Sequence, residues 1–218
     1  LRCLVGSEMC IRDRITPFDD FPIHQTAETL AVPSSSDRNH YDRYWFNGFS
    51  EEKDFLFEIG VGFYPNRHIM DAHFSISTAG KQYSYHASAR MNPARYPINI
   101  GPISLEILEP MQKIRFSLKD PEKKLSCDLI FNAVTEPHLE PKSLMIEGTR
   151  KILETSRFTQ FGKWDGSIET ESGNLDLTKE YGTRDKSWGV RPVGEPEIGA
   201  PGKLNAEPGV YWLSLIHI

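Results

Sequence analysis

Apolar and polar residues alternate along most of the chain between residues 41 and 133, a pattern typical of strands that bury one face of a sheet. The clearest run places Phe55, Phe57, Ile59, Val61 and Phe63 at every second position. The same period recurs in Tyr44 and Phe46; in Ala72, Phe74 and Ile76; in Tyr83, Tyr85, Ala87 and Ala89; in Leu105 and Ile107; in Ile114, Phe116 and Leu118; and in Leu125, Cys127, Leu129, Phe131 and Ala133. Short connections separate these series, so the pattern predicts an all-β, antiparallel meander that forms a barrel or a sandwich.

Other segments are less regular. Residues 15–40 contain three prolines and no clear period, which predicts an extended N-terminal arm before a barrel domain at residues 41–194. Residues 143–155 are compatible with a helix or a strand, and the strand is favoured. The pair Asp165-Gly166 predicts a turn. Residues 182–194, GTRDKSWGVRPVG, are too polar for a buried strand and too rich in glycine for a stable helix, so their side chains are expected to serve a site or an interface.

The two ends of the chain have an unusual origin. Residues 3–14, CLVGSEMCIRDR, and residues 213–218, LSLIHI, resemble the translations of opposite strands of one transposase sequencing adapter. Residues 1–14 and 213–218 are therefore expected to be adapter-derived. Residues 195–212, rich in Pro and Gly, are expected to form a linker and the start of a second, truncated β domain.

Composition narrows the function classes. The chain carries a net charge of −5, and no run of Lys and Arg gives the electrostatic footprint of a nucleic-acid-binding protein. No apolar run is long enough to predict a membrane span. Outside the adapter-like ends Cys127 is the only cysteine, and it is expected to be a small buried apolar residue in a cytoplasmic protein. Because phosphate-binding glycine loops and Cys or His pairs with zinc spacing are absent from the sequence, no cofactor or metal is expected.

Asp185 is the candidate acid or base within residues 182–194. In a strand, its neighbours Arg184 and Lys186 would point to the opposite face, and Asp185 could lie in an apolar mouth near Trp188 with a raised pKa, suited to proton transfer. Arg184 or Arg191 would then hold a polar end of the ligand. The structural alternative is an Arg–Asp clamp that closes the barrel or grips the next domain, with Trp188 as an apolar plug.

A second group of candidates lies on the polar faces of the predicted strands. Gly60 and Gly62 share one face with Tyr64, where missing side chains permit either sharp coiling or the close approach of a ligand. The polar positions of the next two strands, among them His86, line either a wet cavity or a solvent-exposed surface.

Three segments carry a resemblance to a known family: DRYWFNGF at residues 42–49, GVGFYPNR at residues 60–67, and GTRDKSWGVRPVG. They resemble two-domain, lipocalin-like (calycin-like) β-barrel proteins related to carotenoid hydratase (hydroxyneurosporene synthase) and, more distantly, to tocopherol cyclase. The similarity extends over nearly all of residues 15–212 and is closest to an uncharacterised bacterial subfamily.

The resemblance implies a site as well as a fold. The D-x-x-W-G element of the hydratase branch matches Asp185, Trp188 and Gly189, with Lys186 standing where a His is typical. It implies acid-initiated chemistry on lipid-like or terpenoid double bonds, with the aspartic acid as proton donor and aromatic rings stabilising a carbocation.

Two functions follow for this chain. The first is a protein that binds an apolar lipid- or terpenoid-like small molecule and hydrates, isomerises or cyclises it, with the missing second domain of the same chain as a partner. The second is a non-catalytic lipid carrier or interaction module.

Overall fold

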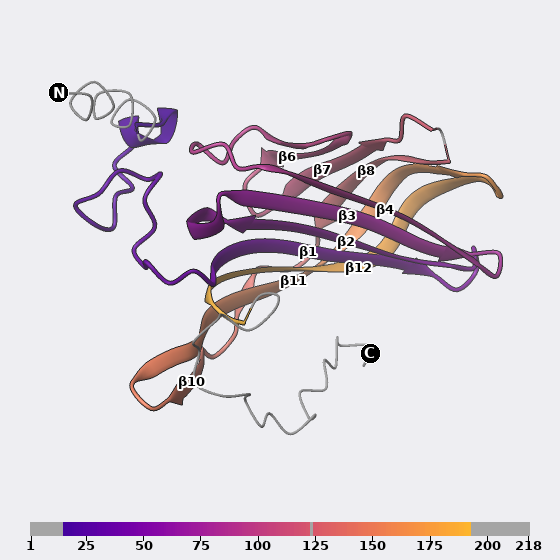
Figure 1. The fold of residues 1–218 in the computed structure, drawn as a ribbon. Helices are drawn as coiled ribbons and strands as arrows, with labels where there is room; N and C mark the ends of the chain where they lie inside the picture. Colours follow the sequence, from indigo (N-terminus) through magenta and orange to yellow (C-terminus); the bar gives the residue numbers. More distant parts are fainter. Residues whose placement is uncertain (1–14, 123, 193–218) are drawn as a thin grey trace.

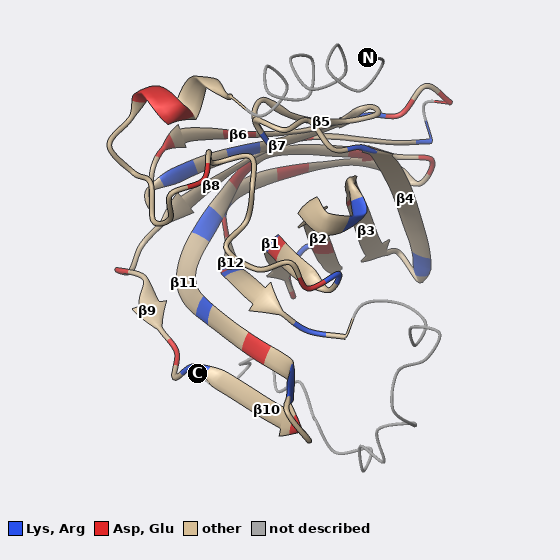
Figure 2. Cartoon of the chain, turned by 60° about the vertical axis from the view of Figure 1, so that its left-hand side comes forward, with Lys and Arg blue, Asp and Glu red and all other residues tan. Residues whose placement is uncertain are grey.

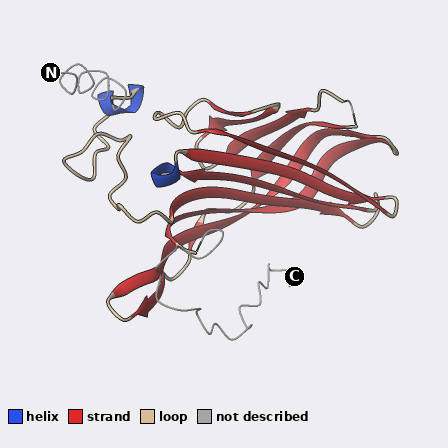
Figure 3. Cartoon of the chain, in the orientation of Figure 1, coloured by secondary structure: helices blue, strands red, loops and turns tan. Residues whose placement is uncertain are grey.

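The computed structural model describes residues 15–122 and 124–192, and in this part the chain is almost entirely β-structure (Figures 1 and 3). The strands are β1 (His40–Ser50), β2 (Phe55–Tyr64), β3 (Ile69–Thr78), β4 (Lys81–Arg90), β5 (Ile98–Ile100), β6 (Ile103–Glu109), β7 (Lys113–Lys119), β8 (Leu125–Ala133), β9 (His138–Leu139), β10 (Ser143–Glu147), β11 (Arg150–Thr170) and β12 (Gly173–Val190). Two single-turn 3₁₀ helices, η1 (Pro17–Asp20) and η2 (Pro65–Arg67), complete the described elements. No helix within these ranges has the length and apolar character needed to cross a bilayer.

The strands form one antiparallel sheet in the order β4-β3-β2-β1-β12-β11-β8-β7-β6-β5. Strands β9 and β10 pair with the N-terminal half of β11. The sheet curls so that its end strands β4 and β5 come into contact, which makes a nearly closed barrel (Figure 2). The long hairpin of β11 and β12 joins the two halves of the meander, because β12 pairs with β1 and β11 pairs with β8. The predicted all-β, antiparallel barrel is confirmed.

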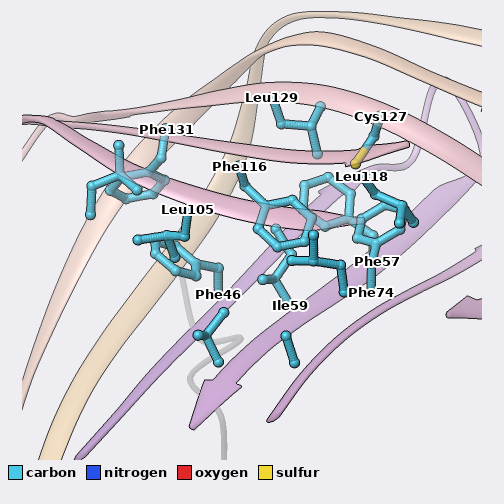
Figure 4. Close-up of a cluster of buried hydrophobic side chains, with 14 of the residues drawn as sticks. Phe46, Phe57, Ile59, Phe74, Leu105, Phe116, Leu118, Cys127, Leu129 and Phe131 are labelled. Carbon is cyan, nitrogen blue, oxygen red and sulfur yellow. The ribbon is translucent and has the colours of Figure 1, made fainter. Parts of the chain in front are cut away.

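The apolar series predicted from the sequence line the inside of this barrel. Its centre is filled by fully buried rings and branched side chains, including Phe46, Phe57, Phe74, Phe116 and Phe131 (Figure 4). Burial of each such side chain contributes about 1.5–3 kcal/mol, so this cluster supplies the main driving force for closing the sheet. Cys127 is also buried there as a free thiol, as expected.

Trp164 of β11 is fully buried at the point where the two halves meet. Its indole nitrogen donates a hydrogen bond to the backbone carbonyl of Asn47 at 2.7 Å, and its ring contacts Phe46, Phe57 and Phe131 edge to face. Gly48 and Gly182, which pair across β1 and β12, leave room for this ring, and Gly162, which pairs with Gly182 from β11, leaves room for the ring of Phe131. A Cβ atom on Gly182 would lie 2.3 Å from the indole nitrogen.

The structure corrects two predictions about local conformation. Residues 182–190 belong to β12 and are not too polar for a strand, because Arg184 finds a buried partner in Gln160. The pair Asp165-Gly166 is not a turn but lies within β11, where the pairing with β12 shifts after Trp164 and Gly166 takes a φ of 134°. Residues 143–155 form strands, as favoured, and the segment beyond residue 192 lies outside the described residues.

The arm at residues 15–39 contains η1 and no strand, and it lies across one end of the barrel (Figure 1). The side-chain amide of Asn66, in η2, donates hydrogen bonds to the backbone carbonyls of Ser35 and Asp37. Asp19 accepts hydrogen bonds from the backbone amides of Thr16 and Leu30. The bonds from Asn66 attach the C-terminal end of the arm to the barrel, and the bonds to Asp19 hold residues 16–30 in a closed loop.

We expect Gly182→Ala to destabilise the protein by about 1–3 kcal/mol, because its Cβ would displace Trp164 or the Asn47 carbonyl. Urea denaturation of the two proteins, monitored by circular dichroism, measures this difference. Thr178→Ala, at an exposed position of the same strand, is the control and should change the free energy of unfolding by less than about 0.5 kcal/mol. Equal losses of stability in the two variants would contradict the claim that Gly182 makes room for Trp164.

Candidate functional site

Strand β12 separates the two groups of candidate residues, because successive side chains point to opposite faces of a sheet. Its register with β1 pairs Asp185 with Trp45 and Lys186 with Tyr44. Tyr44 packs against the core, so Lys186 lies on the inner face and Asp185 on the outer face. Trp188 pairs with Asp42 and lies on the inner face near Lys186, 5.8 Å from its ammonium nitrogen to the ring centroid.

This register settles where the predicted residues lie relative to one another. Arg184 and Lys186 do face away from Asp185, as alternation predicted. The expectation that Trp188 lies beside Asp185 is wrong, since a spacing of three residues along a strand sends the two side chains to opposite faces. The aromatic residue next to Asp185 is its cross-strand partner Trp45.

On the outer face, an open cleft of about 330 Å³ lies over β1 to β4. Its lining combines side chains from four strands with the residue that follows β12: Arg43, Gly60, Val61, Gly62, Tyr64, Asp71, Ala72, His73, His86, Ala87, Ser88 and Arg191. The structure thus brings together the predicted Gly60, Gly62, Tyr64, His86 and Arg191. It does not bring Arg184 or Trp188 to this cleft.

The two glycines form the floor of the cleft. A Cβ on Gly60 would lie 2.3 Å from the imidazole of His73, and one on Gly62 would lie 2.7 Å from both the Asp71 carboxylate and the Tyr64 hydroxyl. The space that these glycines leave is therefore occupied by side chains of the same protein. The glycines let these side chains lie flat against the sheet.

Asp71 and Tyr64 form a buried acidic pair within the lining. Burial raises the pKa of Asp71, against the opposing effects of Arg43 and of the hydrogen bond from Tyr64. Burial also raises the pKa of the Tyr64 hydroxyl, and the nearby Asp71 carboxylate adds to that shift. Arg191 forms a hydrogen bond with Tyr64 and lies over the ring of Tyr41, 4.5 Å from its centroid. The cleft therefore holds a carboxyl group with a raised pKa, on which the charges of Arg43 and Arg191 both act.

His73 supplies the complementary base. It lies two residues after Asp71 on β3, on the same face, and its ring stacks on that of His86 with centroids 5.7 Å apart. Burial lowers the pKa of His73 to about 4, and the positive charge of Arg43 acts in the same direction. At neutral pH the imidazole is unprotonated and can accept a proton.

Asp185 does not line this cleft but lies beside it in the same outer layer, with only 4% of its surface exposed. Burial raises its pKa to about 6, while Arg157 and Arg43 oppose the shift. The Arg157 guanidinium lies 4.0 Å from the carboxylate and is itself held by Glu140 at 2.8 Å. The raised pKa agrees with the expectation for a proton-transferring group, although its environment is a polar layer rather than an apolar mouth.

The inner-face residues form a different cluster at the barrel mouth. The Arg184 side chain is buried, donates a hydrogen bond from Nε to the side-chain oxygen of Gln160 at 2.8 Å, and lies over the rings of Phe131 and Phe158. Lys186 forms an ion pair with Asp42 and lies 4.6 Å above the Tyr44 ring. These contacts resemble the structural clamp considered for this segment, except that Gln160 replaces Asp185 as the partner of Arg184.

Sequence reasoning missed four residues of the outer layer: Arg43, Trp45, Asp71 and His73. Asp71 and His73 occupy polar positions of a clearly alternating strand, and Arg43 and Trp45 occupy alternate positions in the DRYWFNGF segment. The signal that could have selected them is the register between strands, which places Asp185, Trp45, Gly60, His73 and His86 in one row across the sheet.

The comparisons with known proteins give a family and a fold. Residues 15–217 match the model of a family of unknown function, DUF8625. Among curated proteins, none matches this sequence. The solved structures that resemble it include an AttH-like protein from Nitrosomonas europaea, with a TM-score of 0.56 and 13% identity, and kievitone hydratase from Nectria haematococca, with a TM-score of 0.49 and 12% identity.

The two alignments cover 79% and 81% of this chain, respectively, but the chain spans only 58% and 55% of the lengths of those proteins. At such low identity, the resemblance to the AttH-like protein concerns the fold.

The raised pKa of Asp185 predicts a pH-dependent loss of stability. Because the unfolded carboxyl group titrates near 3.8 and the folded one near 6, the folded state binds more protons between these values, and stability falls as pH rises from about 4 to 6. The contribution amounts to about 2–3 kcal/mol at ~1.4 kcal/mol per pKa unit. We expect Asp185→Asn to remove it, which urea denaturation at pH 4.5 and pH 7.5 measures. An unchanged difference between the two pH values would contradict the assignment.

Proposed function

This chain belongs to the family of unknown function DUF8625, and we propose that it binds a lipid- or terpenoid-like small molecule and hydrates, isomerises or cyclises it by acid–base chemistry in the outer cleft. The observation that carries the proposal is the pairing of a protonatable carboxyl group with a neutral imidazole on one face of β3. Burial favours the protonated form of Asp71 and the neutral form of His73, so the first would donate a proton and the second accept one, as adding water across a double bond or moving the bond requires.

The two arginines of the cleft would determine which end of the ligand enters it. Arg43 and Arg191 line the cleft on the side of Tyr64 and Asp71, and they would hold an oxygen of the ligand and stabilise negative charge that develops there. The lining is largely polar, which favours the oxygenated, unsaturated end of such a molecule as the reacting group. The apolar remainder would extend along the open side of the cleft.

Asp185 and Trp45 form the second layer of the proposed site. The matching D-x-x-W-G element supports Asp185 as a proton donor, and its raised pKa leaves it protonated in part near neutral pH. Trp45 lies directly across from it on β1, where the face of its ring could stabilise a developing cation. Arg43 would couple the two carboxyl groups electrostatically, because its charge acts on both Asp185 and Asp71.

The test incubates the protein with a bacterial lipid extract in D₂O and searches by mass spectrometry for molecules that gain deuterium on carbon. We expect wild-type protein to label at least one retained molecule, and Asp71→Asn and Asp185→Asn each to slow labelling by about a hundredfold or more, because each removes a proton donor. Asp176→Asn, an exposed carboxylate on β12, is the matched control and should label at the wild-type rate.

The opposite outcome is equally informative. Retention of lipid by the wild-type protein without any labelling would overturn catalysis and favour the non-catalytic carrier. Equal labelling by all three variants would show that the chemistry takes place elsewhere in the molecule.

A further inference from the structure

Several buried polar atoms without hydrogen-bond partners lie on the inner side of the sheet, between the arm and the barrel mouth. The Oγ1 atom of Thr29, the Nδ1 atom of His40, and the Nε and Nη2 atoms of Arg95 are buried and make no hydrogen bond among the described residues. Buried polar groups are normally paired, so a cluster of unpaired ones indicates a missing partner. All three residues line one pocket of about 220 Å³ under the arm.

Arg95 is the centre of this cluster. Its unpaired Nε and Nη2 atoms form one edge of the planar guanidinium, the edge that binds a carboxylate through two parallel hydrogen bonds. Its backbone is held in a turn by a 2.8 Å hydrogen bond to the carbonyl of Asn92 and takes a φ of 57°, which is uncommon for a residue with a side chain. The half-buried Arg95 side chain extends from this turn, with its Nε and Nη2 atoms shielded from solvent.

The surrounding charges leave Arg95 uncompensated. Asp42 also lines the pocket, but it forms an ion pair with Lys186, and this pair is neutral overall whichever partner holds the proton. Burial lowers the pKa of His40, and the Arg95 charge acts in the same direction, so His40 adds no positive charge near neutral pH. Glu28 and Asp42 line the same pocket, and Asp37 acts electrostatically on His40. None of these carboxylates bonds the Nε or Nη2 atom of Arg95 within the described residues, so this edge of the guanidinium is open to an anionic group.

An apolar pocket of about 170 Å³ adjoins the same guanidinium. Arg95 and Asp42 line both pockets, and the other walls of the second one are Phe18, Tyr44, Phe63, Ala94, Tyr96, Ile98 and Ile107. Phe18 comes from η1 in the arm and contacts Tyr96 edge to face, with ring centroids 6.0 Å apart. The volume corresponds to about six methylene-sized groups, at the ~30 Å³ that a water molecule occupies in the liquid.

We propose that the barrel mouth binds a medium-chain carboxylic acid, with its carboxylate on the Nε and Nη2 edge of Arg95 and its chain in the apolar pocket closed by Phe18. This site is separate from the outer cleft, since Asp42 and Trp188 line it from the inner side of β1 and β12. It does not depend on the function proposed above. The arm acts as a cover, because it supplies Phe18 to one pocket and Thr29 to the other.

The test is isothermal titration calorimetry with octanoate, a medium-chain carboxylate, and with octan-1-ol, which has a chain of the same length without the charge. We expect octanoate to bind saturably and at least tenfold more tightly than octan-1-ol. Arg95→Gln should weaken octanoate binding by about ten- to a hundredfold, in line with charge-assisted hydrogen bonds of about 1.5–3 kcal/mol, and should leave octan-1-ol binding nearly unchanged. Arg90→Gln, an exposed arginine on β4, is the matched control and should bind octanoate like wild type.

Three outcomes would overturn the proposal: no saturable binding of octanoate, equal binding of octanoate and octan-1-ol by the wild-type protein, or wild-type affinity for octanoate in Arg95→Gln. The comparison of the two ligands uses wild-type protein alone, so it decides the matter even if Arg95→Gln fails to fold. Phe18→Ala offers a further check, because it should weaken both ligands about equally by removing a wall of the pocket rather than the charge.

Discussion

The alternation of side chains along β12 is the constraint on which both proposed sites depend. Because β12 pairs in unbroken register with β1 from Tyr181 to Val190, each residue of this stretch is committed to one face of the sheet. Asp185 is thereby placed in the polar outer layer, and Lys186, the next residue, is placed at the barrel mouth. The same strand serves two chemically different surfaces, and a shift of one residue in register would exchange them.

The register itself is held by the packing around Trp164. Gly48 and Gly182 admit its ring, and the hydrogen bond from the ring to Asn47 ties β11 to β1 across β12. Asn47 also accepts hydrogen bonds at its side-chain oxygen from the backbone amide and hydroxyl of Thr183, two residues before Asp185. The position of the candidate acid is therefore coupled to the centre of the core, which is the rigid part of the fold.

Much of the fold could be predicted from the sequence because alternation is a local signal. Phe57, Phe74 and Phe116 were assigned to the core from their spacing alone, and they are fully buried. The strand nature of residues 182–190 could not be predicted in the same way, because burial of Arg184 depends on Gln160, which is 24 residues away in sequence. The Asp165-Gly166 pair was misassigned for a similar reason, since a bulge in a long hairpin and a turn use the same residue types.

The candidate site was predictable only in part. Gly60, Gly62, Tyr64, His86 and Arg191 were selected and do line one cleft. Asp71 and His73 were noted only as polar positions, because their importance comes from burial and from neighbours on other strands. Trp188 was placed beside Asp185 from their nearness in sequence, and the pleat of the strand separates them. In a β-barrel, chemistry is assembled across strands, so residues far apart in sequence meet more often than residues three apart.

The central claim is that burial prepares the outer layer for proton transfer near neutral pH, and Asp185 tests it most directly. A ¹³C NMR titration of the aspartate carboxyl groups, with the Asp185 signal assigned by its loss in Asp185→Asn, measures the pKa of this group in the folded protein. The account predicts a midpoint near 6, as burial raises it from 3.8. A midpoint near 4 would contradict it, since Asp185 would then be an ordinary ionised partner of Arg157 and not a proton donor.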